Sequence, residues 1–291
     1  MSNENIGFTT IPETAPNQPE KKKTFEEYIN FINFDILKNI YKSIYDRARL
    51  DTTNMNFFRQ EKIQNRGSLG FGKYSVRENT LGVNWFYIES QLSKDFPEVN
   101  PQMMLTYVLF HEETHALSKV DCSPDPQFGG QQLERLGYER EIPAKKGWYD
   151  DVFEAFNEGV TDNIAHEVFR EYASQTGSFT DQEVDKFLAW QKKNIYSLEK
   201  HLADTFVIKL TKATGLSNDT VWDAVKSGLF TGDNLYKSEL REYLDDELGA
   251  EYMERLSRGK ILRTKKEPRG LIEQKTRDLK AAVLKLSRKF K

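Results

Sequence analysis

Two histidines four residues apart, with a glutamate directly after the first, are the most informative feature of this 291-residue chain. They lie in the run His111-Glu112-Glu113-Thr114-His115. On a helix, positions i and i+4 share one face, so both imidazoles can bind one metal ion while Glu112 lies beside its open coordination position. The pattern predicts a zinc hydrolase with Glu112 as general base. The alternative interpretation is two surface histidines on an ordinary helix.

The residues around this motif predict a buried helix. Asn100 is a favourable N-cap, Pro101 suits the first helical position, and Ser118 and the polar residues after it favour termination. Buried imidazoles need partners for their ring nitrogens, and a shared metal ion would satisfy both histidines. The apolar positions that predict burial are Met103, Met104, Tyr107, Val108, Phe110 and Leu117.

A catalytic zinc site of this kind has three protein ligands and a water, so a third ligand is expected downstream. The best candidate is Glu158, which shares a predicted helical face with Asp162. Asp162 is then placed to hydrogen-bond a metal-bound imidazole, although a solvated helix charge is the alternative for it. The small residues Ala155 and Gly159 beside Glu158 predict close packing of this helix against the helix of His111.

Two other residues are alternative third ligands. Asp121 follows His115 by six residues, which is where metzincin sites place their last ligand, but those sites turn at a glycine where this chain has Ser118. His166 lies two helical turns beyond Glu158 and would reach a different depth along the helix.

The His-Glu-x-x-His motif, followed by Asn-Glu-x-x-Thr-Asp, resembles the gluzincin metallopeptidases over the stretch from about Leu81 to Tyr172. The 42 residues between His115 and Glu158 exceed the interval in thermolysin-like members, and the run from Phe156 to Asp162 looks more like small bacterial gluzincins. The resemblance implies a zincin-like fold, one catalytic zinc ion and hydrolysis of a peptide or protein substrate. It implies these roles: His111, His115 and Glu158 as ligands, Glu112 as base, and Asp162 as the residue that orients an imidazole.

Several functional questions stay open at this level. Such sites commonly add a donor to the developing oxyanion, and Tyr149, His201 and Tyr138 are unranked candidates. A zinc hydrolase that acts on a non-peptide amide is a third alternative. A different class of function is a catalytically degenerate zincin-fold protein that binds or regulates a partner through its basic C-terminal helix. Loss of Glu112 would abolish turnover by an enzyme and leave such a binding protein unaffected.

The elements before the motif predict a small sheet beside it. Residues 71–76 and 81–88 are predicted to be strands of a hairpin around the turn 77–80, with Trp85, Phe86 and Tyr87 in the second strand. In zincins a strand before the motif helix binds extended substrate at the sheet edge, and a hairpin with only a core role is the alternative. Residues 122–148, rich in Pro, Gly and charge, are predicted to form a loop at the cleft rim.

The whole chain is expected to be α+β, with a mainly helical C-terminal lobe. Residues 1–23 are polar and predict a disordered tail, and residues 24–257 form the zincin-like domain. Within it we distinguish an upper part, a loop insert and a helical lobe, over residues 24–121, 122–148 and 149–257. Helices are predicted from a capping box at Thr24 and over residues 180–214, 219–227 and 237–258.

The C-terminal segment has the opposite charge to the rest. Residues 258–291 carry 13 Lys or Arg and 3 Asp or Glu, a net of +10, so the other 257 residues carry −13 within the total of −3. The segment predicts a basic amphipathic helix that docks on its own acidic domain, binds nucleic acid or an anionic membrane, or has no separate role. Its apolar face comprises Ile272, Leu279, Val283, Leu286 and Phe290.

The cellular compartment is predicted from features that the sequence lacks. No stretch has the apolar length of a membrane span or a signal-peptide core, and the single cysteine, Cys122, excludes an internal disulfide. We therefore expect a cytoplasmic protein.

Overall fold

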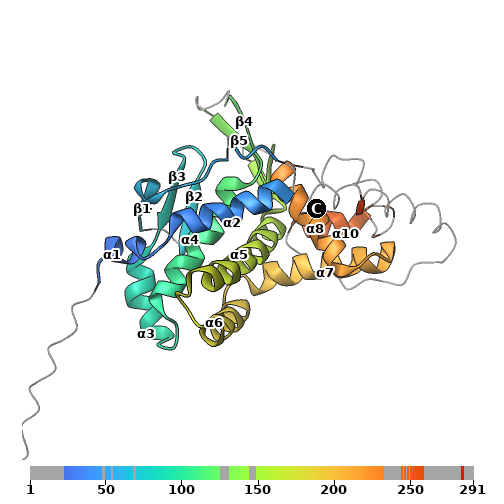
Figure 1. Ribbon diagram of the computed structural model, residues 1–291. Helices are drawn as coiled ribbons and strands as arrows, with labels where there is room; N and C mark the ends of the chain where they lie inside the picture. Colours follow the sequence, from blue (N-terminus) through green and yellow to red (C-terminus); the bar gives the residue numbers. More distant parts are fainter. Residues whose placement is uncertain are drawn as a thin grey trace, which may run out of the picture.

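Two buried helices, α4 (Pro101–Leu117) and α5 (Glu154–Thr176), pack against each other at the centre of the structure (Figure 1). This computed structural model describes residues 23–47, 50–53, 55–67, 70–124, 131–143, 149–232 and 250–258, with residues 244, 246, 248, 283 and 284. Small sheets beside many helices make the fold α+β, which confirms the predicted class.

Helix α4 has the boundaries that its sequence predicts. The Asn100 side chain accepts a hydrogen bond from the Gln102 N–H at 2.8 Å, and Pro101 occupies the first turn. The helix ends at Leu117, and Ser118 adopts an extended conformation. Every residue from Gln102 to Leu117 is buried, so the motif lies on a core helix and not on a surface helix.

Helix α5 lies between α4 and α7 (Ser197–Thr214). α5 packs against α4 as expected, but Gly159, which was expected to permit this packing, faces α7 instead. A Cβ atom at Gly159 would lie 2.2 Å from the Glu199 carbonyl oxygen, so the missing side chain permits close approach of α7 instead. The reason is geometric, because Gly159 follows Glu158 by about 100° around the helix and therefore faces a different neighbour.

The sheet beside α4 has three strands in the order β1-β3-β2, so β2 is an edge strand. They are β1 (Ile63–Asn65), β2 (Gly72–Ser75) and β3 (Thr80–Val83); β1 pairs parallel and β2 antiparallel with β3. The short 3-10 helix η1 (Gln60–Lys62) precedes them.

The predicted hairpin is therefore confirmed, but its second strand is shorter than expected. After β3 the chain enters the π-helix η2 (Tyr87–Leu92) and α3 (Ser93–Asp95), so Trp85, Phe86 and Tyr87 are not in a strand. The Asn84 side chain accepts a hydrogen bond from the Tyr87 N–H at 3.2 Å, and this local contact starts the helical turn.

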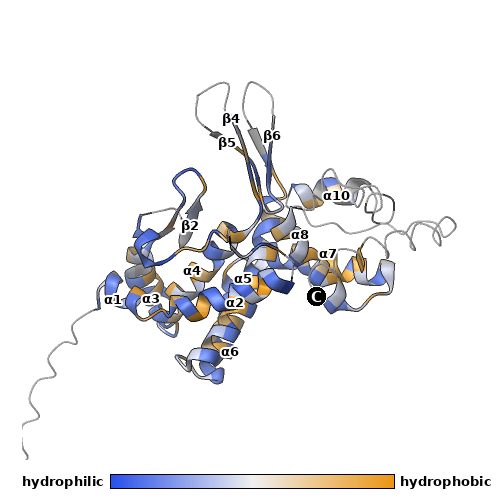
Figure 2. Ribbon diagram, turned by 45° about the horizontal axis from the view of Figure 1, so that its top comes forward, coloured by the Kyte–Doolittle hydropathy of each residue, from blue (hydrophilic) through white to orange (hydrophobic). Residues whose placement is uncertain are grey.

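The segment predicted as a loop over residues 122–148 contains strands, so that prediction is wrong. Two antiparallel ribbons form an arm: β4 (Val120–Pro124) with β5 (Gln131–Leu136), and β6 (Arg140–Pro143) with β7 (Tyr149–Val152). A tight turn at Gly137, where φ is +60°, joins β5 to β6. The arm projects from the helices (Figure 2). Residues 125–130, which lie outside the described residues, are rich in proline and glycine. Their composition made the whole segment resemble a loop, so the short strands on either side were not predicted.

The helix predicted over residues 180–214 is two helices, α6 (Asp181–Asn194) and α7. The capping box at Thr180 and the stop before Gly215 are confirmed. Between the two helices, Tyr196 has φ 52° and ψ 28°, a left-handed conformation that interrupts the helix.

Further helices surround this centre. α1 (Phe25–Asn30) begins at the predicted capping box of Thr24, and α2 (Phe34–Arg47) follows it. α8 (Asn218–Thr231) includes the predicted helix 219–227. α10 (Ala250–Ser257) matches the end of the predicted helix 237–258, whose residues 237–243 lie outside the described residues.

The two charged ends of the chain lie almost wholly outside the described residues. These are residues 1–22 of the predicted tail and most of 258–291, the predicted basic helix. Val283, within that predicted helix, is helical and 1% exposed. In the described part of the chain, no helix is both long and apolar enough to cross a bilayer.

Candidate metal centre

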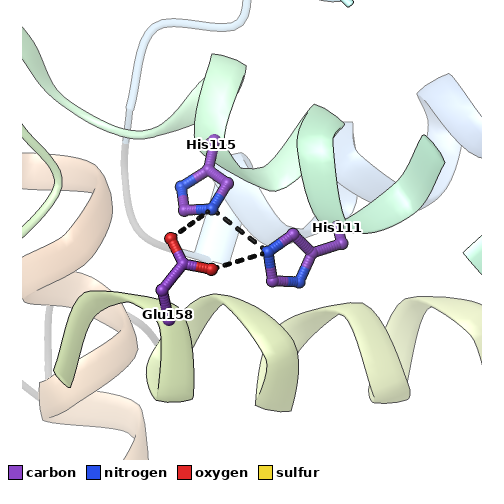
Figure 3. Close-up of side chains that lie close together, drawn as sticks. All are labelled: His111, His115 and Glu158. Carbon is purple, nitrogen blue, oxygen red and sulfur yellow. Dashed lines mark hydrogen bonds and ion pairs between the residues drawn. The ribbon is translucent and has the colours of Figure 1, made fainter. Parts of the chain in front are cut away.

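Two helices bring three potential metal ligands together. His111 and His115 lie one turn apart on α4, and Glu158 faces them from α5 (Figure 3). The Nε2 atoms of the two imidazoles are 3.2 Å apart. Glu158 places Oε2 3.0 Å from His111 Nε2 and Oε1 3.1 Å from His115 Nε2. Among the described residues, this is the group of His, Cys, Asp and Glu side chains that could hold a metal ion.

These separations fit a zinc ion. A tetrahedral site with bonds of about 2.0 to 2.2 Å has edges of about 3.4 Å, close to the spacings seen here. Two imidazole nitrogens and one carboxylate are also a donor set that zinc prefers, and they leave one position for water. The histidines are 3% and 5% exposed, so a bound ion would be held in a largely dry environment.

Neither alternative third ligand joins this group. Asp121 lies in β4, where its carboxylate pairs with Lys119 Nζ at 3.1 Å and Arg135 Nε at 3.5 Å. His166 lies farther along α5, where its Nε2 contacts Lys200 and Gln191. The structure therefore favours Glu158 over both.

Opposite charges on these neighbouring side chains shift the pKa values of His111 and Glu158. Burial opposes a charged imidazole at His111, but hydrogen bonds that it donates to the carboxylates of Asp162 and Glu158 outweigh burial and raise the pKa of His111 to about 10. Burial also opposes ionisation of Glu158, and the two histidines outweigh it, so the pKa of Glu158 falls well below its ordinary value. A proton and a metal ion would thus compete for His111.

Asp162 lies behind His111, as its helical spacing from Glu158 predicts. Its Oδ1 is 3.6 Å from His111 Nδ1, and its side chain is 0% exposed, which excludes the alternative of a solvated helix charge. Burial opposes ionisation, but His111 and Lys200 lower the pKa of Asp162 to about 2. The buried carboxylate is therefore placed to fix the orientation of the imidazole.

Glu112 points from the same helix toward the edge strand β2. Its Oε2 accepts a hydrogen bond from the Tyr74 N–H at 2.7 Å, and burial raises its pKa. A Cβ atom at Gly72 would lie 2.9 Å from Glu112 Oε1, so β2 and Glu112 are in close contact. The next residue, Glu113, points elsewhere and accepts a hydrogen bond from the Phe58 N–H at 2.9 Å.

A cleft of about 870 Å³ includes Glu112, His115 and Glu158 in its wall. Strand β2 with the turn after it, the arm, the first turn of α5, and Tyr196 with the first turn of α7 form the rest of that wall. The arm contributes acidic residues, and burial together with neighbouring carboxylates raises the pKa of Glu139 to about 7. The cleft is large enough for several residues of an extended peptide.

Two of the three predicted oxyanion donors, Tyr138 and His201, do not line the cleft. The Tyr138 hydroxyl is buried and donates to the Val225 carbonyl at 2.7 Å. His201 is exposed on α7 and does not line the cleft. Tyr149 begins β7, and its side chain lies outside the described residues.

Sequence reasoning missed Tyr196, which lines the cleft next to the ligands. Its ring stacks on the His111 ring with centroids 4.8 Å apart and an angle of 2° between the planes. Burial and the carboxylates of Glu158 and Glu112 raise the pKa of its hydroxyl, which therefore stays protonated and can donate. In the sequence, the one sign that the helix ends before Tyr196 was Asn194, because asparagine is a residue type that favours helix ends.

Comparisons with known proteins give no further guidance. No protein-family model, no curated protein and no solved structure matches this chain.

Proposed function

We propose that the protein is a zinc-dependent metallopeptidase with a zincin-like catalytic domain of gluzincin type. The observation that carries the proposal is the convergence of ligand atoms from two buried histidines, His111 and His115, and the partly buried Glu158 beside a cleft that also contains Glu112. A general base beside a metal position with one open coordination site is what hydrolysis of an amide needs.

When bound, zinc would acidify a water molecule and polarise the substrate carbonyl. Glu112 takes the proton of the attacking water and delivers it to the leaving amine. Burial raises the pKa of this carboxyl, which brings its basicity closer to that required at neutral pH. The Tyr74 N–H holds the carboxylate in place, and the Tyr196 hydroxyl donates a hydrogen bond to the carbonyl oxygen as negative charge develops.

Strand β2 supports a peptide as the substrate. It is an edge strand, and its residues 72–75 line the cleft. The Tyr74 N–H bonds to Glu112 and not to β3, so the backbone at this position faces the cleft. An extended peptide would add to this edge through main-chain hydrogen bonds, which places its carbonyl groups along the row that passes Glu112.

Elemental analysis of protein purified without added metal tests the metal site. We expect one zinc ion per wild-type chain, loss of zinc in Glu158→Gln, and retention of zinc in Asp121→Asn. A peptide-library screen then tests the activity, with Glu112→Gln as the control that keeps zinc and loses turnover. Wild-type protein without zinc, or Glu112→Gln with full activity, would contradict the proposal.

A further inference from the structure

We infer that Lys200 is a positioning residue for the metal centre, because its buried ammonium group holds the Asp162 carboxylate in the orientation that aims Oδ1 at His111. This inference rests on the proposed function, since it concerns the same metal ligand. Lys200 does not touch the three ligand side chains in any described contact, and it acts through Asp162.

Four helices meet at the Asp162 side chain. On its Oδ1 side, the Tyr107 hydroxyl of α4 donates a hydrogen bond, and Gln191 Nε2 of α6 donates another at 2.8 Å. On its Oδ2 side, Lys200 Nζ of α7 lies at 3.1 Å, and His166 Nε2 lies at 3.9 Å. Asp162 thus accepts hydrogen bonds at Oδ1 and forms an ion pair with Lys200 at Oδ2, and these contacts oppose rotation of its carboxylate away from His111.

Lys200 is itself fixed in one position. It is 5% exposed, and its Nζ lies 2.9 Å from His166 Nε2 as well as near Asp162. Burial and the nearby ammonium lower the pKa of His166 to about 4, so His166 is neutral and leaves Lys200 as the cation beside Asp162. A long lysine side chain that is buried and ion-paired has little freedom left.

Close packing of α7 on α5 is what brings Lys200 to this position. Glu199, the residue before Lys200, places its backbone against Gly159, where a Cβ atom would lie 2.2 Å from the carbonyl oxygen. Tyr196, whose ring stacks on His111, is the N-cap residue directly before the first turn of α7. One close helix contact therefore delivers both a ring against His111 and a cation behind Asp162.

Two effects of Lys200 on a bound metal oppose each other. Its positive charge repels a cation, whereas its hold on Asp162 orients the imidazole that binds the cation. The Asp162 carboxylate and the His111 ring lie between the ammonium and the metal position, so the repulsion is largely offset by the Asp162 charge. We expect the orienting effect to dominate.

The test measures zinc affinity by competition with a chromophoric chelator, for the full-length chain. Lys200→Met should raise the zinc dissociation constant about 10- to 100-fold, the usual cost of losing an outer partner of a ligating histidine. The matched control is Lys226→Met, because Lys226 is also a buried lysine, 7% exposed, that pairs with a carboxylate of α5, Glu167. Lys226→Met should lose stability without losing zinc affinity.

A double-mutant cycle shows whether Lys200 acts through Asp162. In the Asp162→Asn background there is no carboxylate to hold, so adding Lys200→Met should change zinc affinity little. Additive losses would overturn the inference. Lys200→Gln keeps a polar group at the buried position and serves in place of Lys200→Met if that variant does not fold, with a loss in the same direction expected.

The outcomes separate this inference from the function on which it rests. Equal zinc affinity in wild type and Lys200→Met, or an equal loss in Lys200→Met and Lys226→Met, would overturn the role of Lys200 and leave the zinc site standing. Wild-type protein that binds no zinc would refute the proposed function and this inference together.

Discussion

Replacing Gly72 by alanine tests the contact between the edge strand and the proposed base. A Cβ atom there would lie 2.6 Å from Val108 Cγ1, and 2.9 Å from both Cγ and Oε1 of Glu112. Carbon atoms in contact prefer separations of about 3.5 to 4.0 Å, so β2 or the Glu112 side chain must move by about 1 Å. Overpacking of this kind costs about 1 to 3 kcal/mol of stability.

We expect Gly72→Ala to keep zinc and lose activity. His111, His115 and Glu158 do not contact Gly72 in the described structure, whereas the bond from the Tyr74 N–H to Glu112 lies beside it. A misplacement of about 1 Å at a catalytic group can lower the rate about 10²-fold.

Urea denaturation, zinc content and peptide turnover measure the three consequences of this change. Gly67→Ala is the matched control, since a Cβ atom at Gly67 would have no neighbour within 4 Å. If Gly72→Ala unfolds at the same urea concentration as Gly67→Ala and keeps the wild-type rate, then β2 does not press on Glu112 and the proposed positioning of the base is wrong.

Three other perturbations test the rest of the site. Zinc binding should release about one proton near pH 7.5, because the pKa of His111 is raised to about 10 and the metal needs the neutral imidazole. The apparent zinc affinity should then rise about tenfold per pH unit below that pKa. Calorimetry in buffers of different ionisation enthalpy measures the proton release. Tyr196→Phe keeps the ring stacked on His111 and removes the hydroxyl, so kcat should fall about 10²-fold with zinc affinity unchanged, and an unchanged kcat would exclude the oxyanion role. Gly159→Ala should force α5 and α7 apart and destabilise the protein by several kcal/mol in thermal unfolding, because its Cβ atom meets rigid backbone at 2.2 Å.

Those parts of the site that depend on a single helix were predictable from the sequence. The relative position of His111 and His115 follows from one turn of α4, and the relation of Glu158 to Asp162 follows from one turn of α5. Strong N-cap and apolar signals also placed α4 correctly.

The residues that the sequence did not reveal depend on contacts between helices. Tyr196 and Lys200 reach His111 and Asp162 only because α7 approaches α5 at Gly159, and no local pattern encodes which neighbour a glycine will face. The break between α6 and α7 at Tyr196 was missed for the same reason. The residues around Tyr196 have helical propensity, and the ring of Tyr196 stacks on His111, which belongs to another helix.

The arm failed as a prediction because its signal is short. Its strands have four to six residues, and they lie beside turn residues that dominate the composition of the segment. A short β-strand is stabilised by the strand that it pairs with. A short run such as Gln131–Leu136, taken without its partner β4, therefore has the sequence pattern of a loop.

The motif also serves the fold, which decides how its substitutions must be interpreted. The two histidines face α5 and Glu112 faces β2, whereas Glu113 binds the Phe58 N–H and Thr114 meets the Tyr41 hydroxyl at 2.8 Å. Successive residues of one helix point about 100° apart, so this short run contacts several layers of the protein at once. Loss of activity in Glu113 or Thr114 variants would therefore reflect lost packing, and only variants that keep their folding stability and zinc content can assign a chemical role.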